Sequence, residues 1–295
     1  MLDVGKLALL REVATHGGIS SAAAALEMSA SNVSQQLRRL ERDYGVSLLE
    51  PRGRGVSLTP AAERLVRRTE EVLGMLEAAE TELVSTRDTA SRTVRLVGFH
   101  TFAVGLLGSV VAQLRALAPD LSLEFTQLEP EAAIDAVLAR RADLAVIDEY
   151  AGLPLAPTPG IVRVVLGREP VRAYLPTGAE PAADASWAME PAASDSATWM
   201  RSVCRTAGFE PRARYVSPDP YVHRRLLEQG IAAAFLPATV AADLPAHVRL
   251  ADGIPAGLHR THTLILRRGT ERSASIDACR AAIAAALSDA VGEST

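Results

Sequence analysis

Residues 19–45 constrain the N-terminal fold most strongly, because two short helical segments follow each other with almost nothing between them. In the second segment the apolar residues Val33, Leu37, Leu40 and Tyr44 recur at steps of four, three and four. This spacing places them on one face of an α-helix. Ser29 or Ser31 can cap that helix, and Gly45 can end it. The stretch therefore predicts a helix-turn-helix.

The opposite face of the second helix carries short polar side chains first and arginines afterwards. These residues are Ser31, Ser34, Gln35, Arg38, Arg39 and Arg42. A helix that enters a DNA major groove needs this order, with small polar groups at the base edges and cations near the phosphates. An arginine-bearing helix pair also occurs in many soluble helical proteins, so the residues that follow must decide between the two interpretations.

A basic hairpin is predicted directly after the helix pair. Two β-prone pieces, residues 48–49 and 56–58, flank a turn that contains Arg52 and Arg54. A helix pair followed by such a hairpin indicates a winged helix, whose wing can reach the DNA backbone or minor groove. The whole chain has a net charge of −4, but residues 30–68 contain eight arginines and only four acidic residues. Positive charge is thus concentrated where DNA would bind.

A long helix is predicted to begin at Thr59-Pro60 and to run to about Thr86, with threonine as its cap and proline in its first turn. Small and apolar residues alternate along it by four and three, as at the core positions of a coiled coil. They are Leu58, Ala62, Leu65, Thr69, Val72, Leu76, Ala79 and Leu83. The pattern favours a dimerisation coil, and the alternative is an amphipathic helix that packs on its own domain.

From residue 94 onward predicted strands alternate with predicted helices, after a polar hinge at residues 88–92. The strands are expected at 94–98, 121–128, 142–147, 162–176, 212–217, 231–236 and 261–267. The helices are expected at 102–116, 131–140, around Trp199, at 220–229 and at 275–287. Such alternation implies an α/β fold with parallel strands and right-handed crossovers.

The sequence lacks the signals that would indicate a metal site, secretion, a membrane span or two common kinds of enzyme active site. Cys204 and Cys279 are too far apart for metal-binding spacing, and no segment resembles a secretion signal. The longest apolar run, residues 230–242, is shorter than the ~20 residues of a membrane span. Neither a Gly-x-Ser-x-Gly motif nor a glycine-rich phosphate loop occurs. We therefore expect a cytoplasmic protein that is not an enzyme, holds no cofactor or metal and contacts no membrane.

The first ninety residues closely resemble the LysR-type transcriptional regulators. The resemblance rests on SSAAAAL at 20–26, VSQQLRRLE at 33–41, GVSLL at 45–49 and GRGVSLTPA at 53–61. Later segments, including GIAAAFLP at 230–237, fit that family's effector domain in order. Ala30 departs from the polar residue usual at the start of the recognition helix, which removes one candidate base contact.

The resemblance implies three parts. These are a winged helix-turn-helix DNA-binding domain at 1–59, a linker and dimerisation helix at 60–88, and an effector-binding domain at 92–295. The effector domain would have two subdomains like those of periplasmic binding proteins of type 2, one at 92–161 plus 268–295 and the other at 162–267. The effector would bind between them.

Ligands of such sheets bind beyond the carboxyl ends of the strands. The predicted effector-binding residues are Phe99, His100, Thr101, Glu129, Pro130, Asp148, Tyr150, Ser196, Ser217 and Asp219. Other roles stay open for them. The threonine and the serines can be plain helix caps, and His100 can be a solvated loop residue. The acidic residues either repel ligands or indicate a cationic or hydroxyl-rich effector.

By this resemblance the protein is a dimeric or tetrameric regulator that reads an inverted repeat in double-stranded DNA. A small-molecule effector would alter the separation of its two recognition helices, and RNA polymerase is a further expected partner. Two alternatives remain open from the sequence. One is a metabolite sensor that does not bind DNA, and the other is an α/β enzyme with an N-terminal helical appendage.

Overall fold

The computed structural model describes residues 1–52, 55–85, 92–153, 155–271 and 273–292. Contacts divide the chain into an N-terminal unit, which contains the first four helices, and a C-terminal unit, which contains most of the remainder. Each unit has its own hydrophobic core. The predicted hinge lies outside the described residues except for Arg92, which begins the first strand of the C-terminal unit.

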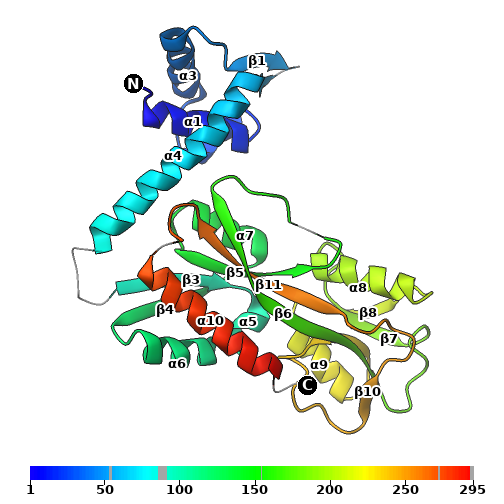
Figure 1. Cartoon of the computed structure of the whole chain (residues 1–295). Helices are drawn as coiled ribbons and strands as arrows, with labels where there is room; N and C mark the ends of the chain where they lie inside the picture. Colours follow the sequence, from blue (N-terminus) through cyan, green and yellow to red (C-terminus); the bar gives the residue numbers. More distant parts are fainter. Residues whose placement is uncertain (53–54, 86–91, 154, 272, 293–295) are drawn as a thin grey trace. The chain divides into compact units, whose positions relative to one another are not determined.

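The N-terminal unit is a winged helix (Figure 1). Its elements are α1 (Val4–Thr15), α2 (Ile19–Ala25), α3 (Ala30–Tyr44), β1 (Leu49–Arg52), β2 (Gly55–Leu58) and α4 (Pro60–Ser85). The predicted apolar face of α3 is buried at Val33, Leu37 and Leu40, whereas Tyr44 is exposed. The predicted helix pair and the strands of the hairpin are therefore confirmed.

Side-chain caps define where the helices of this unit begin. The Ser29 hydroxyl accepts a hydrogen bond from Asn32 N at 3.2 Å, so Ser29 rather than Ser31 caps α3. Gly45 ends α3 in the left-handed conformation, with φ of 65°. The Thr59 hydroxyl accepts from Ala62 N at the start of α4 and donates to Ser47 O, which ties this helix to the wing. Ser31 is thus left free of a capping role.

The C-terminal unit is built on one mixed sheet. Its strand order is β4-β3-β5-β11-β6-β9-β7-β8, and β10 pairs with β6. The strands are β3 (Arg92–Gly98), β4 (Leu121–Gln127), β5 (Leu144–Tyr150), β6 (Ile161–Pro176), β7 (Ser186–Met189), β8 (Arg212–Val216), β9 (Ala233–Pro237), β10 (Val248–Leu250) and β11 (His259–Arg267). The first three strands are parallel as predicted, but β11 runs antiparallel to β5 and β6 antiparallel to β9.

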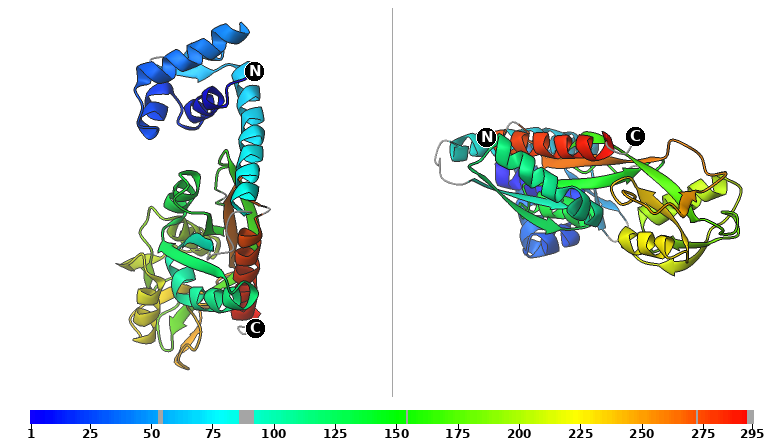
Figure 2. Two further views of the ribbon diagram at one scale, coloured as in Figure 1. Left: turned by 90° about the vertical axis from the view of Figure 1, so that its left-hand side faces the viewer. Right: turned by 90° about the horizontal axis from the view of Figure 1, so that it is seen from below.

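In the described part of the C-terminal unit, six helices cover the sheet in two groups. The first half carries α5 (His100–Gly105), α6 (Leu107–Leu117), α7 (Pro130–Leu138) and α10 (Ala274–Gly292), and the second half carries α8 (Asp195–Thr206) and α9 (Pro220–Glu228). Helices α6 and α10 lie side by side on the first half (Figure 2). The structure is thus a two-subdomain α/β architecture, as expected.

Two long strands cross from one subdomain to the other (Figure 1). The beginning of β6 packs into the first core through Val162, Val164 and Leu166, and its end packs into the second core through Val171 and Leu175. Strand β11 pairs with β5 of the first subdomain over residues 260–266. The crossing in β6 therefore lies inside the strand and that in β11 lies near its beginning, several residues away from the positions 162 and 267 expected from the sequence.

Three local predictions were wrong. The helix predicted at 102–116 is two helices, because the chain breaks at the buried Leu106. Strand β5 continues to Tyr150, so Asp148 and Tyr150 lie within the strand and not after it. Strands β7 and β10 were not predicted at all, since β7 lies within a segment rich in alanine, serine and proline.

Candidate functional site

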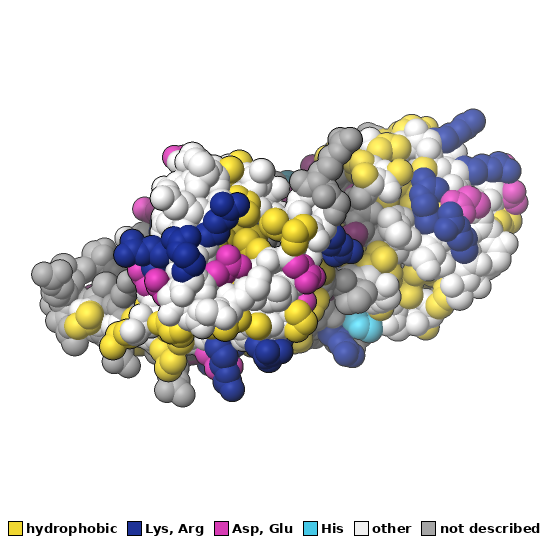
Figure 3. Space-filling view, turned by 90° about the horizontal axis from the view of Figure 1, so that it is seen from above, with side chains coloured by type: hydrophobic (Ala, Val, Ile, Leu, Met, Phe, Trp, Pro, Cys, Tyr) yellow, Lys and Arg dark blue, Asp and Glu magenta, His cyan; other side chains and the backbone are white. Residues whose placement is uncertain are grey.

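Helix α3 presents a polar and basic face to solvent. Ser31, Gln35, Arg38, Arg39 and Arg42 are exposed. Ser34 is half-buried at the edge of this face. Figure 3 shows Lys and Arg side chains, drawn in dark blue, gathered in groups on the face of the molecule that is seen from above. The structure thus brings all six predicted residues of the helix to one face, which we call the α3 face.

Three arginines, Arg38, Arg39 and Arg42, lie together on the α3 face without an ion-pair partner among the described residues. Elsewhere arginines are commonly paired, as Arg95 is with Asp143 and Arg205 is with Glu210. Three unpaired guanidinium groups on one helix face form a site for phosphate groups.

The wing is held close to the α3 face by a carboxylate of α3 itself. Glu41 accepts hydrogen bonds from the backbone N–H groups of Leu48 and Leu49, at 2.8 and 3.1 Å. The hairpin then places Arg52 opposite Gly55 in its register, and Arg52 is exposed. Arg54 lies outside the described residues. One predicted wing arginine is therefore exposed at the end of the first strand of a hairpin whose base is fixed to α3.

A cavity of about 310 Å³ opens between the two subdomains of the C-terminal unit. Eight of the ten predicted effector-binding residues line it, namely Phe99, His100, Thr101, Glu129, Pro130, Asp148, Tyr150 and Ser196. Other lining residues include Glu131, Leu155, Glu190, Ala193, Ser194, Asp195 and Arg260. We call this cavity the central cavity. It lies where the ends of several strands meet the first turns of several helices, namely β3, β4, β5 and β7 with α5, α7 and α8.

Two hydroxyl groups of the central cavity lack partners. The side chains of Thr101 and Ser196 are 3% and 5% exposed, and neither hydroxyl oxygen forms a hydrogen bond within the described protein. Ser194 caps α8 by accepting from Ala197 N at 3.0 Å, so Ser196 does not have that role. Buried hydroxyls are normally paired, and an unpaired one indicates a group that the protein alone does not supply.

The remaining two predicted residues lie outside the cavity wall. Ser217 accepts from Asp219 N at 3.1 Å, which stabilises the loop before α9. Asp219 caps α9 by accepting from Tyr221 N at 2.8 Å, and its Oδ1 lies 3.1 Å from His100 Nε2. His100 is therefore not a free loop side chain, because it links the first subdomain to the second.

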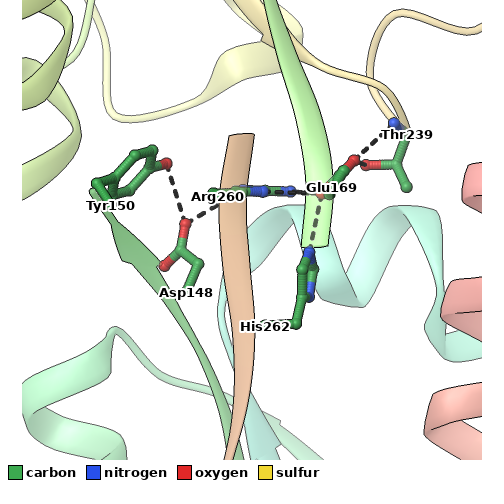
Figure 4. A network of polar contacts seen from close by, with 6 residues as sticks. All are labelled: Asp148, Tyr150, Glu169, Thr239, Arg260 and His262. Carbon is green, nitrogen blue, oxygen red and sulfur yellow. Dashed lines mark hydrogen bonds and ion pairs between the residues drawn. The ribbon is translucent and has the colours of Figure 1, made fainter. Parts of the chain in front are cut away.

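A chain of polar contacts runs from the central cavity to the strands that cross between subdomains (Figure 4). Tyr150 donates to Asp148 at 3.0 Å, and Asp148 accepts from Arg260 at 3.2 Å. Arg260 also donates to Glu169 on β6 at 2.8 Å. Glu169 in turn contacts His262 at 2.9 Å and accepts from the Thr239 backbone N–H and hydroxyl. We call these six residues the crossing network.

The charges within the crossing network stabilise one another. Burial alone would raise the pKa of Glu169, but Arg260, His262 and Thr239 together lower it well below its usual range. Burial alone would lower the pKa of Arg260, and the nearby Glu169, Tyr150 and Asp148 more than reverse this effect. Glu169 and Arg260 are thus an ionised pair in the protein interior, where a charge requires a partner.

Two carboxyl groups of the central cavity have raised pKa values, in contrast to the lowered pKa of Glu169. Burial and the neighbouring Asp148 raise the pKa of Glu190 to about 7, although contacts with Ser196 and Ser194 and the charge of Arg260 act in the opposite direction. Partial burial and Asp148 also raise the pKa of Glu129, which His100 lowers. Among the described residues, neither carboxyl group has an ion-pair partner. Both therefore favour the neutral acid more than an exposed glutamate does.

Sequence reasoning missed Arg260, Glu169 and Glu190. The first two come from antiparallel strands that meet only in the folded sheet, and no local pattern marks their pairing. The same holds for His262, which is buried against Glu169. Glu190 follows β7, and recognising that strand would have marked it by the same rule that selected Glu129.

Other features of the chain lack the signs of a site. A larger hollow of about 530 Å³ lies between β6 and residues 250–258, but none of the buried, unpaired polar atoms lines it. Cys204 and Cys279 are buried, and burial raises the pKa of each thiol to about 12, so neither is reactive at neutral pH. Within the described ranges, no helix has the length and apolar character that crossing a lipid bilayer requires.

Comparison with protein families agrees with both parts of the structure. Residues 4–63 match the family model described as bacterial regulatory helix-turn-helix protein, lysR family. Residues 87–288 match the model described as LysR substrate binding domain. Together the two matches cover most of the chain, and the second alone covers more than half of it.

Individual regulators are similar over different lengths. The chain is 29% identical to the HTH-type transcriptional regulator YofA of Bacillus subtilis (strain 168), over 50% of this chain and 51% of YofA. It is 25% identical to the probable HTH-type transcriptional regulator LrrA of Synechococcus elongatus, over 88% of each chain. It thus spans about half the length of the first relative and most of the second.

Solved structures share the fold of the whole chain. The crystal structure of CbnR, a LysR family transcriptional regulator, has a TM-score of 0.53 at 22% identity and covers 96% of this chain and 100% of its own. Full-length CbnR complexed with its target DNA has a TM-score of 0.50 at 20% identity and covers 99% of each chain.

Proposed function

Because the chain belongs to the LysR family of bacterial transcriptional regulators, we propose that it reads an inverted-repeat operator under the control of an effector in the central cavity. The family provides the DNA-binding domain, the effector-binding domain and the regulatory function. Its named relatives are regulators of transcription, which are not enzymes. Our proposal concerns which residues of this chain perform these roles.

The observation that carries the proposal is the unpaired basic charge of the α3 face. Arg38, Arg39 and Arg42 have no carboxylate partner among the described residues, so binding to phosphate would cost them no existing ion pair. Phosphate contacts of this kind provide most of the affinity for DNA and fix the register of the helix in the groove.

We assign base contacts to the first turns of α3 and phosphate contacts to the remainder. Ser31, Ser34 and Gln35 face the groove, and a glutamine amide can donate to and accept from adenine at the same time. Arg38, Arg39 and Arg42 bind the backbone, and Arg52 of the wing binds an adjacent phosphate, together with Arg54 beyond the described residues. CbnR, a chain of the same fold, has been solved in complex with its target DNA, which is consistent with DNA binding by this fold.

Self-association through α4 would place two α3 faces on one DNA molecule. The first half of the apolar stripe is covered within its own unit, since Ala62 and Thr69 are 0% and 1% exposed. The second half is open, with Leu76 and Leu83 44% and 69% exposed. Exposed apolar residues at coiled-coil spacing favour a partner helix. We propose a homodimer formed by α4, with a tetramer as a dimer of dimers.

We assign each function to the segment predicted from the sequence, with DNA binding at 1–59, the linker at 60–88 and effector binding at 92–295. The central cavity has the size and the mixture of apolar walls and inward polar groups that ligand sites share. The crossing network links its wall to β6 and β11, so a ligand that contacts Asp148 or Arg260 can favour one arrangement of the subdomains. We place the protein in the cytoplasm, with chromosomal DNA and RNA polymerase as partners.

Genome-wide mapping of bound DNA tests the proposal. We expect enriched sites with two-fold symmetric half-sites, whose centres lie one helical turn or a multiple of it apart, because a dimer presents two recognition helices. Footprinting with the purified full chain should protect the same repeat. Enrichment without a symmetric motif would contradict the dimeric reader, and an absence of enriched sites would contradict the regulatory function.

A further inference from the structure

The charges around the central cavity indicate what kind of molecule it binds. Five acidic residues line the cavity, whereas its basic residues are one arginine and one histidine. The acidic residues are Glu129, Glu131, Asp148, Glu190 and Asp195, and the basic ones are Arg260 and His100. Lysine is absent from this wall, since the only lysine of the chain is Lys6.

The one arginine of the cavity is already neutralised. Arg260 is 2% exposed and pairs with Glu169, a fully buried carboxylate that does not line the cavity. It also pairs with Asp148 at 3.2 Å. His100 faces Asp219 at 3.1 Å. An anionic ligand would therefore meet an excess of carboxylates, and the one arginine of the wall already has two carboxylate partners.

The carboxyl groups of the wall are arranged in the way that suits a cation. Asp148 lies close enough to raise the pKa of both Glu129 and Glu190, so its charge disfavours the ionised forms of the two glutamates. Neither glutamate forms an ion pair among the described residues, although His100 and Arg260 lie near enough to lower the pKa of Glu129 and Glu190, respectively. A cation placed among them would remove this repulsion and form charge-assisted hydrogen bonds.

An unpaired hydroxyl is an independent sign of a ligand. Thr101 is more than nine-tenths buried, lines the cavity and forms no hydrogen bond within the described protein. Ser196 lines the same cavity but lies close enough to Glu190 to lower the pKa of this carboxyl group, so Thr101 carries the argument. A hydroxyl that donates requires an acceptor oxygen or nitrogen on the ligand.

We propose that the effector is a small organic amine, whose ammonium group binds Glu129, Asp148 and Glu190 and whose hydrogen-bond acceptor binds the Thr101 hydroxyl. The apolar walls of Phe99 and Leu155 cover its carbon skeleton. This inference rests on the proposed function, because it concerns the same cavity. It adds the chemical class of the ligand and assigns a role to Glu190, which sequence reasoning did not select.

Two matched sets of probes test the charge of the ligand with the full-length protein. The first is benzylamine, benzyl alcohol and benzoate, and the second is butylamine, butanol and butyrate, all at millimolar concentrations. Isothermal titration calorimetry and thermal unfolding would measure binding. We expect the amine of at least one set to bind more tightly than its alcohol and its acid, by roughly tenfold or more.

Variants locate the bound amine. Glu129→Gln and Glu190→Gln should each weaken the amine roughly tenfold or more and leave the alcohol unchanged, because they remove charge and preserve shape. Glu180→Gln is a matched control away from the cavity. Ala193→Trp places a large ring at an exposed position of the cavity wall and should abolish binding of every probe.

The pH dependence distinguishes Glu190 from a merely structural residue. Benzylamine and butylamine stay protonated between pH 6 and 8, so a gain in their affinity over this range reports ionisation of the protein. The charged or titratable groups that face Glu190 are Asp148 and Tyr150 on β5 and Arg260 on β11. We expect amine affinity to rise with pH in the wild type and to stay level in Glu190→Gln.

Each of the other possible outcomes contradicts either the ligand class or the location of the site in the central cavity. If an acid or alcohol binds at least as well as the amine and Ala193→Trp blocks it, the cavity is a ligand site but the ligand class is wrong. If the amine binds and Ala193→Trp does not block it, both the ligand class and the location in the cavity are wrong. If no probe of either set binds, the amine inference is overturned, and the DNA-binding proposal is unaffected.

Discussion

The guanidinium of Arg260 donates a hydrogen bond to Glu169 Oε2 over 2.8 Å, at a point where neither side chain is more than 3% exposed. These two residues join β11 to β6, the strands that cross between the subdomains. The same guanidinium reaches Asp148 in the central cavity. The pair is therefore placed where it can both stabilise the C-terminal unit and respond to a ligand.

Removing the arginine should destabilise the C-terminal unit. Arg260→Met leaves the buried Glu169 without its main cation, and we expect a loss of about 3–5 kcal/mol in the free energy of unfolding. Both tryptophans, Trp187 and Trp199, lie in this unit, so urea unfolding followed by tryptophan fluorescence measures the change. The exposed Arg249, which pairs with Asp252, provides the control, and Arg249→Met should cost less than about 1 kcal/mol. Equal losses in the two variants would contradict the account.

The stability of the same unit should fall as pH rises through neutrality. Burial raises the folded-state pKa of Glu190 to about 7, above its unfolded value, so its contribution is fully present below the unfolded pKa. The contribution is lost as pH rises through the folded pKa, because ionisation then favours the unfolded chain. One pKa unit corresponds to about 1.4 kcal/mol, so we expect a loss of roughly 1–3 kcal/mol between pH 5 and 8.

Two variants show whether Glu190 causes this pH dependence of stability. Urea midpoints at pH 5 and pH 8 should converge in Glu190→Gln, whereas the exposed Asp120→Asn should retain the wild-type dependence on pH. An identical pH dependence in Glu190→Gln and the wild type would show that this carboxyl group is not the source.

Charges on the open half of the α4 stripe should separate the subunits. Leu76 and Leu83 are exposed in one chain, and arginine at both positions would bury two unpaired cations in a helix pair. We expect the double variant Leu76→Arg/Leu83→Arg to sediment as a smaller species than the wild type in analytical ultracentrifugation. Glu63→Arg, an exposed position in the first turn of α4, should sediment like the wild type. A double variant of unchanged mass would rule out α4 as the interface.

The sequence predicted the N-terminal unit well because its signals are local. The spacing of Val33, Leu37 and Leu40 determines which face of α3 is buried, and the polar face follows from it. The apolar stripe along α4 did not by itself distinguish packing within the unit from contact with a partner helix. Its first half packs within its own unit at Ala62 and Thr69, and only the open second half stays available for a partner helix.

The central cavity could be predicted in part from one general rule, namely that ligands bind at the carboxyl ends of strands. This rule selected Thr101, Glu129 and Asp148 correctly as lining residues. It could not select Arg260, because β11 runs antiparallel to β5 and brings the beginning of its strand to the cavity. Buried charges find their partners only when the sheet is assembled, so these pairs cannot be predicted from a short stretch of sequence.

DNA binding by the α3 face is the central claim, and fluorescence anisotropy with the mapped operator tests it directly. The wild type, Gln35→Ala, Arg38→Ala and the control Arg68→Ala would be titrated at several salt concentrations. Arg68 pairs with Glu71 on α4 and lies outside the α3 face.

We predict that Arg38→Ala weakens binding to all sequences and reduces the salt slope by about one, because one phosphate contact is lost. Gln35→Ala should lose roughly 1–3 kcal/mol of discrimination between the operator and a scrambled sequence. Arg68→Ala should match the wild type. Unchanged affinity, discrimination and salt dependence in both Gln35→Ala and Arg38→Ala would contradict the assignment of α3 as the recognition helix.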